Sequence, residues 1–178
     1  EHHDRNHQTV PMAPTDVVDR WRNLGTHHGI GDDTVFVVDI PGPDTRPPLL
    51  YLHGFPTSSI DLASVASRLA EGQRVVTLDL PGYGLSSKPD RPYSLFAQAD
   101  VVLAVLADLG IDEVDLLSHD MGDSVAGELL ARSMLGAHRV TVRRRVLTNG
   151  SIYMDLAQLT DGQKLLLSLP DEAAPAEI

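Results

Sequence analysis

Residues 116–125 read LLSHDMGDSV, and this stretch decides the fold of the chain. A short apolar run precedes it, and an alanine- and leucine-rich run follows it. Asp120 lies at its centre, with the small residues Ser118 and Gly122 two places away on either side. Small neighbours allow a strand and a helix to approach closely around a strained central residue, whose side chain is then pushed out above the sheet. The stretch therefore predicts a sharp strand-to-helix turn that exposes the Asp120 carboxylate beside unpaired backbone N–H groups.

Two other interpretations of this stretch stay open. Ser118 and Asp120 are residue types that commonly cap helices, so a purely structural role is one alternative. An esterase acting through Ser118 or Ser124 is another, although neither serine occupies the centre of the turn.

Composition limits the classes of protein to consider. The chain has 178 residues, of which 42% are hydrophobic, so it suits one globular domain or most of a larger one. The net charge of −11 opposes binding to phosphate backbones, so we expect no nucleic-acid partner. The sequence has no cysteine and no apolar run long enough to span a membrane. We expect a cytoplasmic protein without a signal peptide or a membrane partner.

Short apolar strands alternate with helices along the chain. The predicted strands cover residues 34–40, 49–52, 74–78, 114–117 and 146–148, and the predicted helices cover residues 61–69, 96–109 and 125–134. This order indicates an α/β fold with a mostly parallel, doubly wound sheet. The turn at His53-Gly54, the loop that begins at Asp79 and the turn at Asp120 all follow strands. Since ligands bind at the carboxyl ends of parallel strands, we expect one site there. His27 and His28 are interpreted as a solvated turn.

Three motifs occur in a fixed order: His53-Gly54-Phe55-Pro56, then DxPGxGxS over residues 79–86, and then SHDMG over residues 118–122. Together they resemble the α/β-hydrolase superfamily, in its aspartate-nucleophile branch of epoxide hydrolases and haloalkane dehalogenases. The resemblance implies that Asp120 attacks an electrophilic carbon and forms an alkyl-enzyme ester, which a histidine-activated water then hydrolyses. It also implies that the backbone N–H groups of Phe55 and Met121 form the oxyanion hole.

The resemblance favours epoxide hydrolysis over dehalogenation. Haloalkane dehalogenases commonly hold the halide with side-chain N–H groups at the positions that Phe55 and Met121 occupy here, and neither side chain has one. Epoxide hydrolases protonate the epoxide oxygen with lid tyrosines, and Tyr153 falls where a lid would begin. The expected substrate is a small apolar epoxide or alkyl halide. No cofactor and no metal is implied, and the sequence predicts neither the remaining substrate-binding residues nor the oligomeric state.

The catalytic histidine and acid of the family are not identifiable in the sequence. His138 follows the turn too early to be the base, and Asp155 and Asp161 are acid candidates only by default. We therefore expect a chain that lacks most of the lid and the C-terminal strands. Its predicted parts are a disordered or tag-like terminus over residues 1–15, the N-terminal part of the core over 16–151 and the start of a helical lid over 152–178. A non-catalytic homologue that binds a small apolar ligand or a protein remains the alternative.

Overall fold

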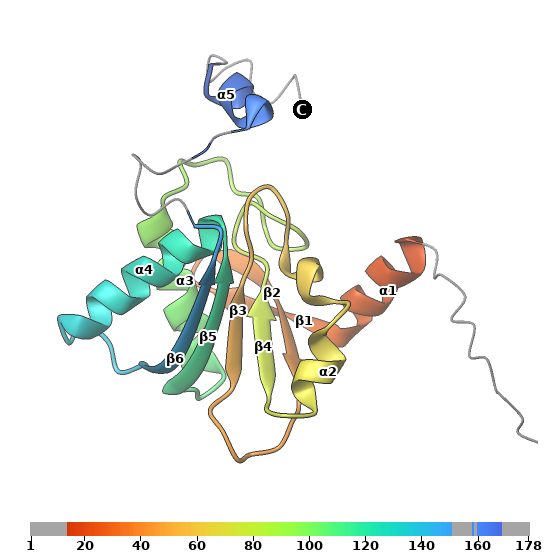
Figure 1. The fold of residues 1–178 in the computed structure, drawn as a ribbon, viewed down its shortest axis with the longest axis vertical. Helices are drawn as coiled ribbons and strands as arrows, with labels where there is room; N and C mark the ends of the chain where they lie inside the picture. The colour runs from red at the N-terminus through yellow and green to blue at the C-terminus, as the bar shows by residue number, and fades with distance from the viewer. Residues whose placement is uncertain (1–13, 151–157, 159, 169–178) are drawn as a thin grey trace, which may run out of the picture.

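A computed structural model describes residues 14–150, 158 and 160–168. Six strands form one sheet in the order β1-β2-β4-β3-β5-β6, with helices on both faces (Figure 1). The strands are β1 Gly25–Ile30, β2 Asp33–Ile40, β3 Leu49–Leu52, β4 Val75–Leu78, β5 Glu113–His119 and β6 Thr141–Thr148. The helices are α1 Pro14–Leu24, the 3₁₀ helix η1 Ser59–Leu62, α2 Ala66–Ala70, α3 Leu95–Asp108, α4 Met121–Met134 and α5 Asp161–Ser168.

The sheet is parallel where the chain alternates between strand and helix. Strand β3 pairs in parallel with β4 and β5, and β5 pairs in parallel with β6. The hairpin β1–β2 is antiparallel, and β2 also pairs antiparallel with β4. The central strands are apolar on both faces because helices cover both, as all four buried residues of β4 illustrate. The predicted α/β class and mostly parallel, doubly wound sheet are therefore confirmed.

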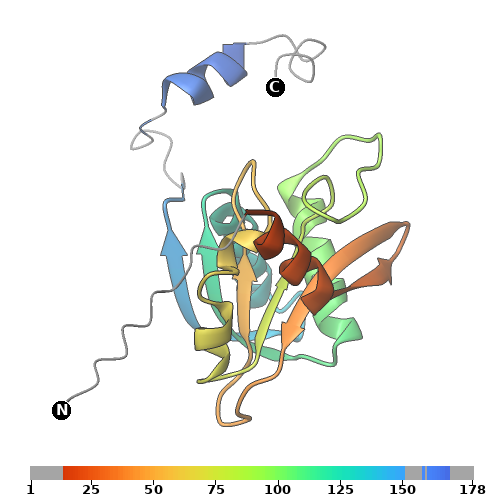
Figure 2. The same cartoon turned by 90° about the vertical axis from the view of Figure 1, so that its right-hand side faces the viewer.

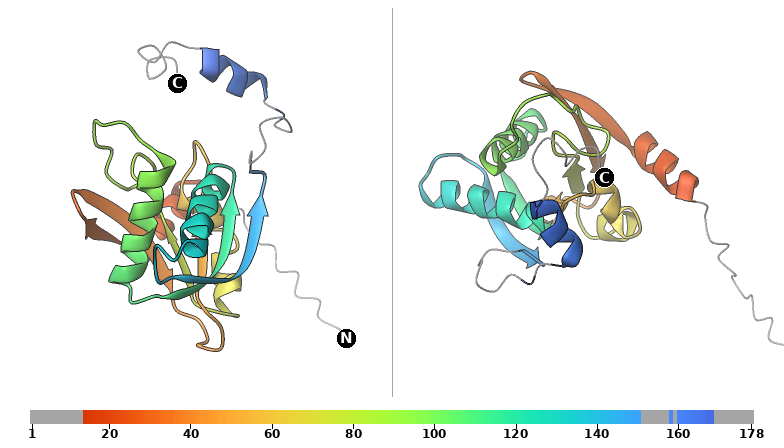
Figure 3. Two further views of the ribbon diagram at one scale, coloured as in Figure 1. Left: turned by 90° about the vertical axis from the view of Figure 1, so that its left-hand side faces the viewer. Right: turned by 90° about the horizontal axis from the view of Figure 1, so that it is seen from above.

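Two apolar clusters lie on opposite faces of the sheet. Figure 2 looks onto the face covered by α1 and α2, where Trp21, Phe36 and Tyr51 belong to the smaller cluster. The left panel of Figure 3 looks onto α3 and α4, whose buried residues, among them Val102 and Val125, pack on the larger cluster. Burial of these side chains supplies the main driving force for folding.

Three predicted elements differ from the structure. His27 and His28 lie in strand β1 and not in a turn, because β1 pairs along its whole length with β2. The predicted helix over residues 61–69 is instead η1 followed by the short helix α2. Strand β6 is longer than residues 146–148, since its arginine-rich first half is held by parallel pairing with β5 and not by an apolar pattern.

Some predictions concern residues outside the described part. Residues 1–13, most of the predicted disordered or tag-like terminus, are among them, and so are Tyr153 and Asp155. In the predicted lid segment, α5 spans Asp161–Ser168, and its assignment to a lid stays a prediction. No helix in the described part of the chain is long and apolar enough to cross a membrane.

Candidate functional site

The turn between β5 and α4 places Asp120 in a backbone conformation that few residues adopt. Its φ is 52° and its ψ is −118°, between the last residue of β5 and the first of α4. This left-handed region is costly for a residue with a side chain, and such strain persists where the surroundings fix it. Gly122 makes the close approach possible, because a Cβ atom there would lie 2.4 Å from the Leu52 carbonyl oxygen. The sharp turn predicted from the spacing of Ser118, Asp120 and Gly122 is present.

Within the part of the chain that the structure describes, hydrogen bonds hold the Asp120 carboxylate through one of its two oxygens. Its Oδ1 accepts hydrogen bonds from the backbone N–H of Phe55, at 2.9 Å, and of Met121, at 2.6 Å. The structure therefore brings together the three residues that the sequence singled out. Gly54 leaves room for this arrangement, since a Cβ atom there would lie 2.7 Å from the Asp120 Cβ.

His53 joins the ends of β3 and β4 from inside the protein. It is fully buried, its Nε2 accepts the backbone N–H of Leu80 at 3.0 Å, and its Nδ1 lies 2.9 Å from the Gly54 carbonyl oxygen. Because Nε2 accepts, Nδ1 carries the proton and donates to Gly54. Burial lowers the pKa of His53, against the opposing effects of the Gly54 bond and the Asp79 and Asp61 charges. His53 thus orients the turn that carries the Phe55 N–H.

Asp79 organises the loop after β4 in the same way. Its Oδ1 accepts the backbone N–H of Ser59 at 2.8 Å, and its Oδ2 accepts that of Leu85 at 2.7 Å. Its main-chain oxygen also accepts the Ser86 hydroxyl at 2.5 Å. The carboxylate is buried, so it ties the η1 segment to the glycine-rich loop. The motif over residues 79–86 is therefore an internal scaffold for the site.

Ser118 and Asp123 form a buried pair beneath the turn. The Ser118 hydroxyl donates to Asp123 Oδ1, and both residues are buried. Asp123 Oδ2 lies against Gly150, where a Cβ atom would be 2.5 Å from that oxygen. This contact, and the hydrogen bond from the Thr148 hydroxyl to the Ser118 carbonyl oxygen at 2.8 Å, join the turn to the end of β6. Ser118 is therefore not exposed as an esterase nucleophile, and Ser124 lies within α4.

Tyr83 borders the same site from the glycine-rich loop. Its ring packs edge-on against His53, with ring centroids 5.4 Å apart, and against Phe55, at 6.2 Å. Its hydroxyl lies 3.4 Å from the Met121 sulfur. Burial, and then the Coulomb effects of Tyr93 and Asp120, raise the pKa of Tyr83, so the phenol is protonated at neutral pH. Tyr83 was not among the residues predicted from sequence, and its place between Gly82 and Gly84 was the available signal.

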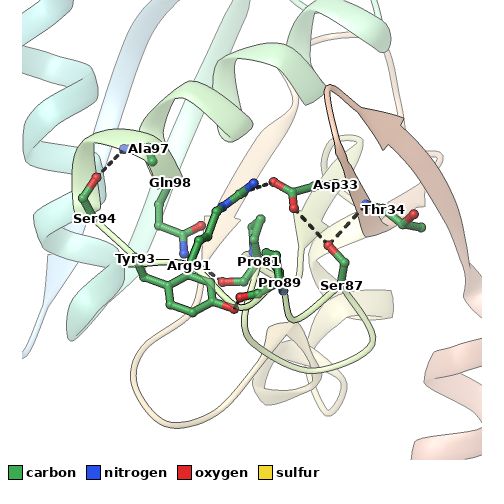
Figure 4. Close-up of polar contacts among 10 residues, drawn as sticks. All are labelled: Asp33, Thr34, Pro81, Ser87, Pro89, Arg91, Tyr93, Ser94, Ala97 and Gln98. Atoms are coloured by element: carbon green, nitrogen blue, oxygen red, sulfur yellow. Dashed lines mark hydrogen bonds and ion pairs between the residues drawn. The ribbon is translucent and has the colours of Figure 1, made fainter. Parts of the chain in front are cut away.

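Polar contacts anchor the segment between the glycine-rich loop and α3 (Figure 4). Arg91 pairs with the buried Asp33, which also accepts the Ser87 hydroxyl at 3.2 Å. The Tyr93 hydroxyl donates to the Pro89 carbonyl oxygen at 2.8 Å. Gln98 donates from Nε2 to the Pro81 carbonyl oxygen, also at 2.8 Å. These bonds fix the path of the loop that presents Tyr83.

The other polar residues considered from sequence lie apart from the Asp120 carboxylate or are engaged. His119 Nε2 lies 3.2 Å from Asn149 Nδ2, and His138 Nε2 lies 2.9 Å from the Leu129 carbonyl oxygen. Asp161 pairs with Lys164 within α5. Among the residues described, no group of three or more histidine, aspartate or glutamate side chains could hold a metal ion.

Comparisons with known proteins identify the family to which this fold belongs. The alpha/beta hydrolase fold family matches residues 47–160. A Mycobacterium tuberculosis protein named "Putative hydrolase LipZ" is 44% identical over 153 residues, which are 85% of this chain and 52% of that protein. The soluble epoxide hydrolase of Corynebacterium sp. is 39% identical over 79 residues, which are 44% of this chain and 28% of that protein.

A solved structure has a similar fold. The haloalkane dehalogenase DbeA of Bradyrhizobium elkani has a TM-score of 0.72 and 28% identity, covering 86% of this chain and 53% of that one. The chain therefore spans about half the length of the LipZ protein and of DbeA.

Proposed function

The chain belongs to the alpha/beta hydrolase fold family, and on that premise we propose that it carries the nucleophile half of a hydrolase site. Asp120 is the nucleophile, and its target is an electrophilic sp³ carbon. The observation that carries the proposal is the asymmetric binding of one carboxylate, whose Oδ1 accepts two backbone N–H groups. Oδ2 is therefore the oxygen that can act as the nucleophile.

The first step follows from this asymmetry. A carboxylate is ionised at neutral pH without a neighbouring base, so Oδ2 attacks carbon directly and an alkyl ester of Asp120 forms. Oδ1 then becomes the carbonyl oxygen of the ester. The N–H groups of Phe55 and Met121 already lie against that oxygen, where negative charge develops again when water attacks the ester.

Epoxides suit this site better than alkyl halides. A departing halide needs donors beside the reacting carbon, and the side chains of Phe55 and Met121 supply no N–H group. An epoxide carries its leaving oxygen on the substrate and needs one proton. The substrate class proposed is therefore a small apolar epoxide, with an alkyl halide as the second candidate, supported by the likeness to DbeA.

Hydrolysis of the ester needs a base that activates water, by family resemblance a histidine. His53 has both ring nitrogens engaged in buried contacts, and the Nε2 of His119 faces Asn149. We infer that neither ring acts as this base, and we therefore expect the ester to persist on this chain, so that reaction stops after one equivalent.

The test is the intact mass of the chain after incubation with styrene oxide, followed by peptide mapping. We expect one adduct, located on Asp120 and released by hydroxylamine, which cleaves esters. Asp120→Asn keeps the Oδ1 acceptor and should give no adduct, whereas Asp112→Asn, at an exposed loop position before β5, should react normally. A wild-type chain that forms no adduct with styrene oxide or with a primary bromoalkane, or an adduct that survives in Asp120→Asn, refutes the proposal. Unmodified chain with saturable binding of the epoxide would favour the non-catalytic homologue.

A further inference from the structure

We propose that the Tyr83 hydroxyl contacts the leaving atom of the substrate and donates its proton there, which makes Tyr83 a second catalytic residue and selects epoxides over alkyl halides. This inference rests on the proposed role of Asp120. It concerns a residue of the glycine-rich loop, and it leaves the predicted lid aside.

The first support is the position of the hydroxyl. Tyr83 Oη lies 3.4 Å from the sulfur of Met121, the residue that follows Asp120 and donates to its carboxylate. The Tyr83 ring also contacts Phe55, which supplies the other N–H group. The phenol therefore borders both residues that hold the Asp120 carboxylate. The side chains of those two residues offer no other hydroxyl or N–H group to a substrate.

The second support is the weakness of the contact that the hydroxyl now makes. A thioether sulfur is a poor acceptor, so the proton can be given to a substrate oxygen with little loss. The ring itself is fixed by its edge-on contacts with His53 and Phe55. The donor is thus held in place while its hydrogen bond remains available, which is the arrangement that efficient proton transfer requires.

The third support is electrostatic. Burial is the largest cause of the raised pKa of Tyr83, followed by Tyr93 and then by the negative charge of Asp120, which helps to keep the phenol protonated in the free protein. Alkylation of Asp120 removes that charge. The phenol therefore becomes a stronger acid in the same step in which the epoxide oxygen needs its proton.

Opening of the epoxide moves one electron pair and one proton. A bond forms between Asp120 Oδ2 and one epoxide carbon, the bond between that carbon and the ring oxygen breaks, and its electron pair goes to the oxygen. The Tyr83 proton moves to that oxygen, giving a hydroxyalkyl ester and a phenolate, and water returns a proton to the phenolate. Displacement of bromide by the same carboxylate needs no proton transfer and gains at most one hydrogen bond from Tyr83, so it should depend far less on that residue than epoxide opening does.

The test compares rates of Asp120 adduct formation with styrene oxide and with a primary bromoalkane. Tyr83→Phe should slow the epoxide reaction about 100-fold or more, the range of general acid catalysis. The same variant should slow the bromoalkane reaction by less than about 10-fold, the effect of losing one hydrogen bond to the departing halide. Tyr51→Phe is the matched control: it removes the phenol of a tyrosine in the smaller apolar cluster, on the face covered by α1 and α2, and both rates should stay at the wild-type level.

The remaining outcomes refute either the role of Tyr83 alone or the roles of both Tyr83 and Asp120. A Tyr83→Phe variant that reacts with the epoxide at the wild-type rate, or that loses both reactions equally, overturns the role of Tyr83 and leaves that of Asp120 standing. A wild-type chain that reacts with the bromoalkane alone has the same meaning. A wild-type chain that forms no adduct with either reagent overturns both proposals.

Discussion

Gly122 should be intolerant of even one added methyl group, and the structure supplies both the reason and a control. A Cβ atom there would lie 2.4 Å from the Leu52 carbonyl oxygen and 2.7 Å from that of His53. Both atoms belong to the backbone at the end of β3, so relief requires that the strand or the helix move. Overpacking of this kind costs about 1–3 kcal/mol, and rigid backbone neighbours place Gly122→Ala at the upper end, near 3 kcal/mol.

Gly127 is the matched control, because it lies in the same helix, is exposed, and a Cβ atom there meets nothing within 4 Å. Gly127→Ala should stabilise the protein by about 0.5–1 kcal/mol through helix propensity alone. The two substitutions are chemically identical and should have opposite signs.

The assay is unfolding followed by circular dichroism, with heat and with urea. At about 2–4 °C per kcal/mol for a chain of this size, Gly122→Ala should melt roughly 10 °C below the wild type, and Gly127→Ala a few degrees above it. If Gly122→Ala is within about 0.5 kcal/mol of the wild type, the close approach of α4 to β3 is not the constraint described here.

Two further predictions concern the scaffold. Because burial lowers the pKa of His53 below its ordinary 6.5, the unfolded chain binds more protons below that pH. The contribution of His53 to stability should therefore be complete above about pH 6.5 and decline as the pH falls toward the folded-state pKa, by at most about 1.4 kcal/mol per pH unit. Urea midpoints between pH 7.5 and 5 measure this, and the same slope in His53→Gln would contradict it. Arg91→Ala removes the cation paired with the buried Asp33 and should lower the free energy of unfolding by about 1–3 kcal/mol. Arg22→Ala, in an exposed pair, should lower it by almost nothing. Equal urea midpoints for the two variants would refute this reasoning.

The turn at Asp120 could be predicted from sequence because its cause is local. Small residues at positions 118 and 122 favour a sharp turn at Asp120, and the apolar run before Ser118 is typical of a buried strand. The same reasoning failed for His27 and His28, whose strand exists because β2 offers a partner edge. Strand β6 was predicted too short for the same reason, since the pairing of Arg144 and Arg145 with β5 has no signature in their own residue types.

Apart from the approach of Phe55 to Asp120, which the family resemblance implied, the contacts among the loops could not be predicted. Sequence placed His53 and the residue 79–86 motif at strand ends, and those placements agree with the structure. It gave no indication that the His53 ring accepts from Leu80, or that Asp79 holds two loops at once. Such contacts depend on which strands become neighbours, and the order β4-β3-β5 is not the order of the chain. Tyr83 was missed because its partners lie 28 and 38 residues away along the chain, at Phe55 and Met121.

The two hydrogen bonds on Asp120 Oδ1 have a consequence for symmetry. In free aspartate the two carboxylate oxygens are interchangeable, and each carries half of the charge. In the folded protein the two oxygens differ before any substrate arrives. Oδ1 accepts two backbone N–H groups, and Oδ2 keeps its share of the charge. Rotation of the carboxylate would break both hydrogen bonds, so the fold maintains the difference between Oδ1 and Oδ2. An electrophile therefore meets a single reactive atom, and the regiochemistry of the encounter is a property of the folded backbone.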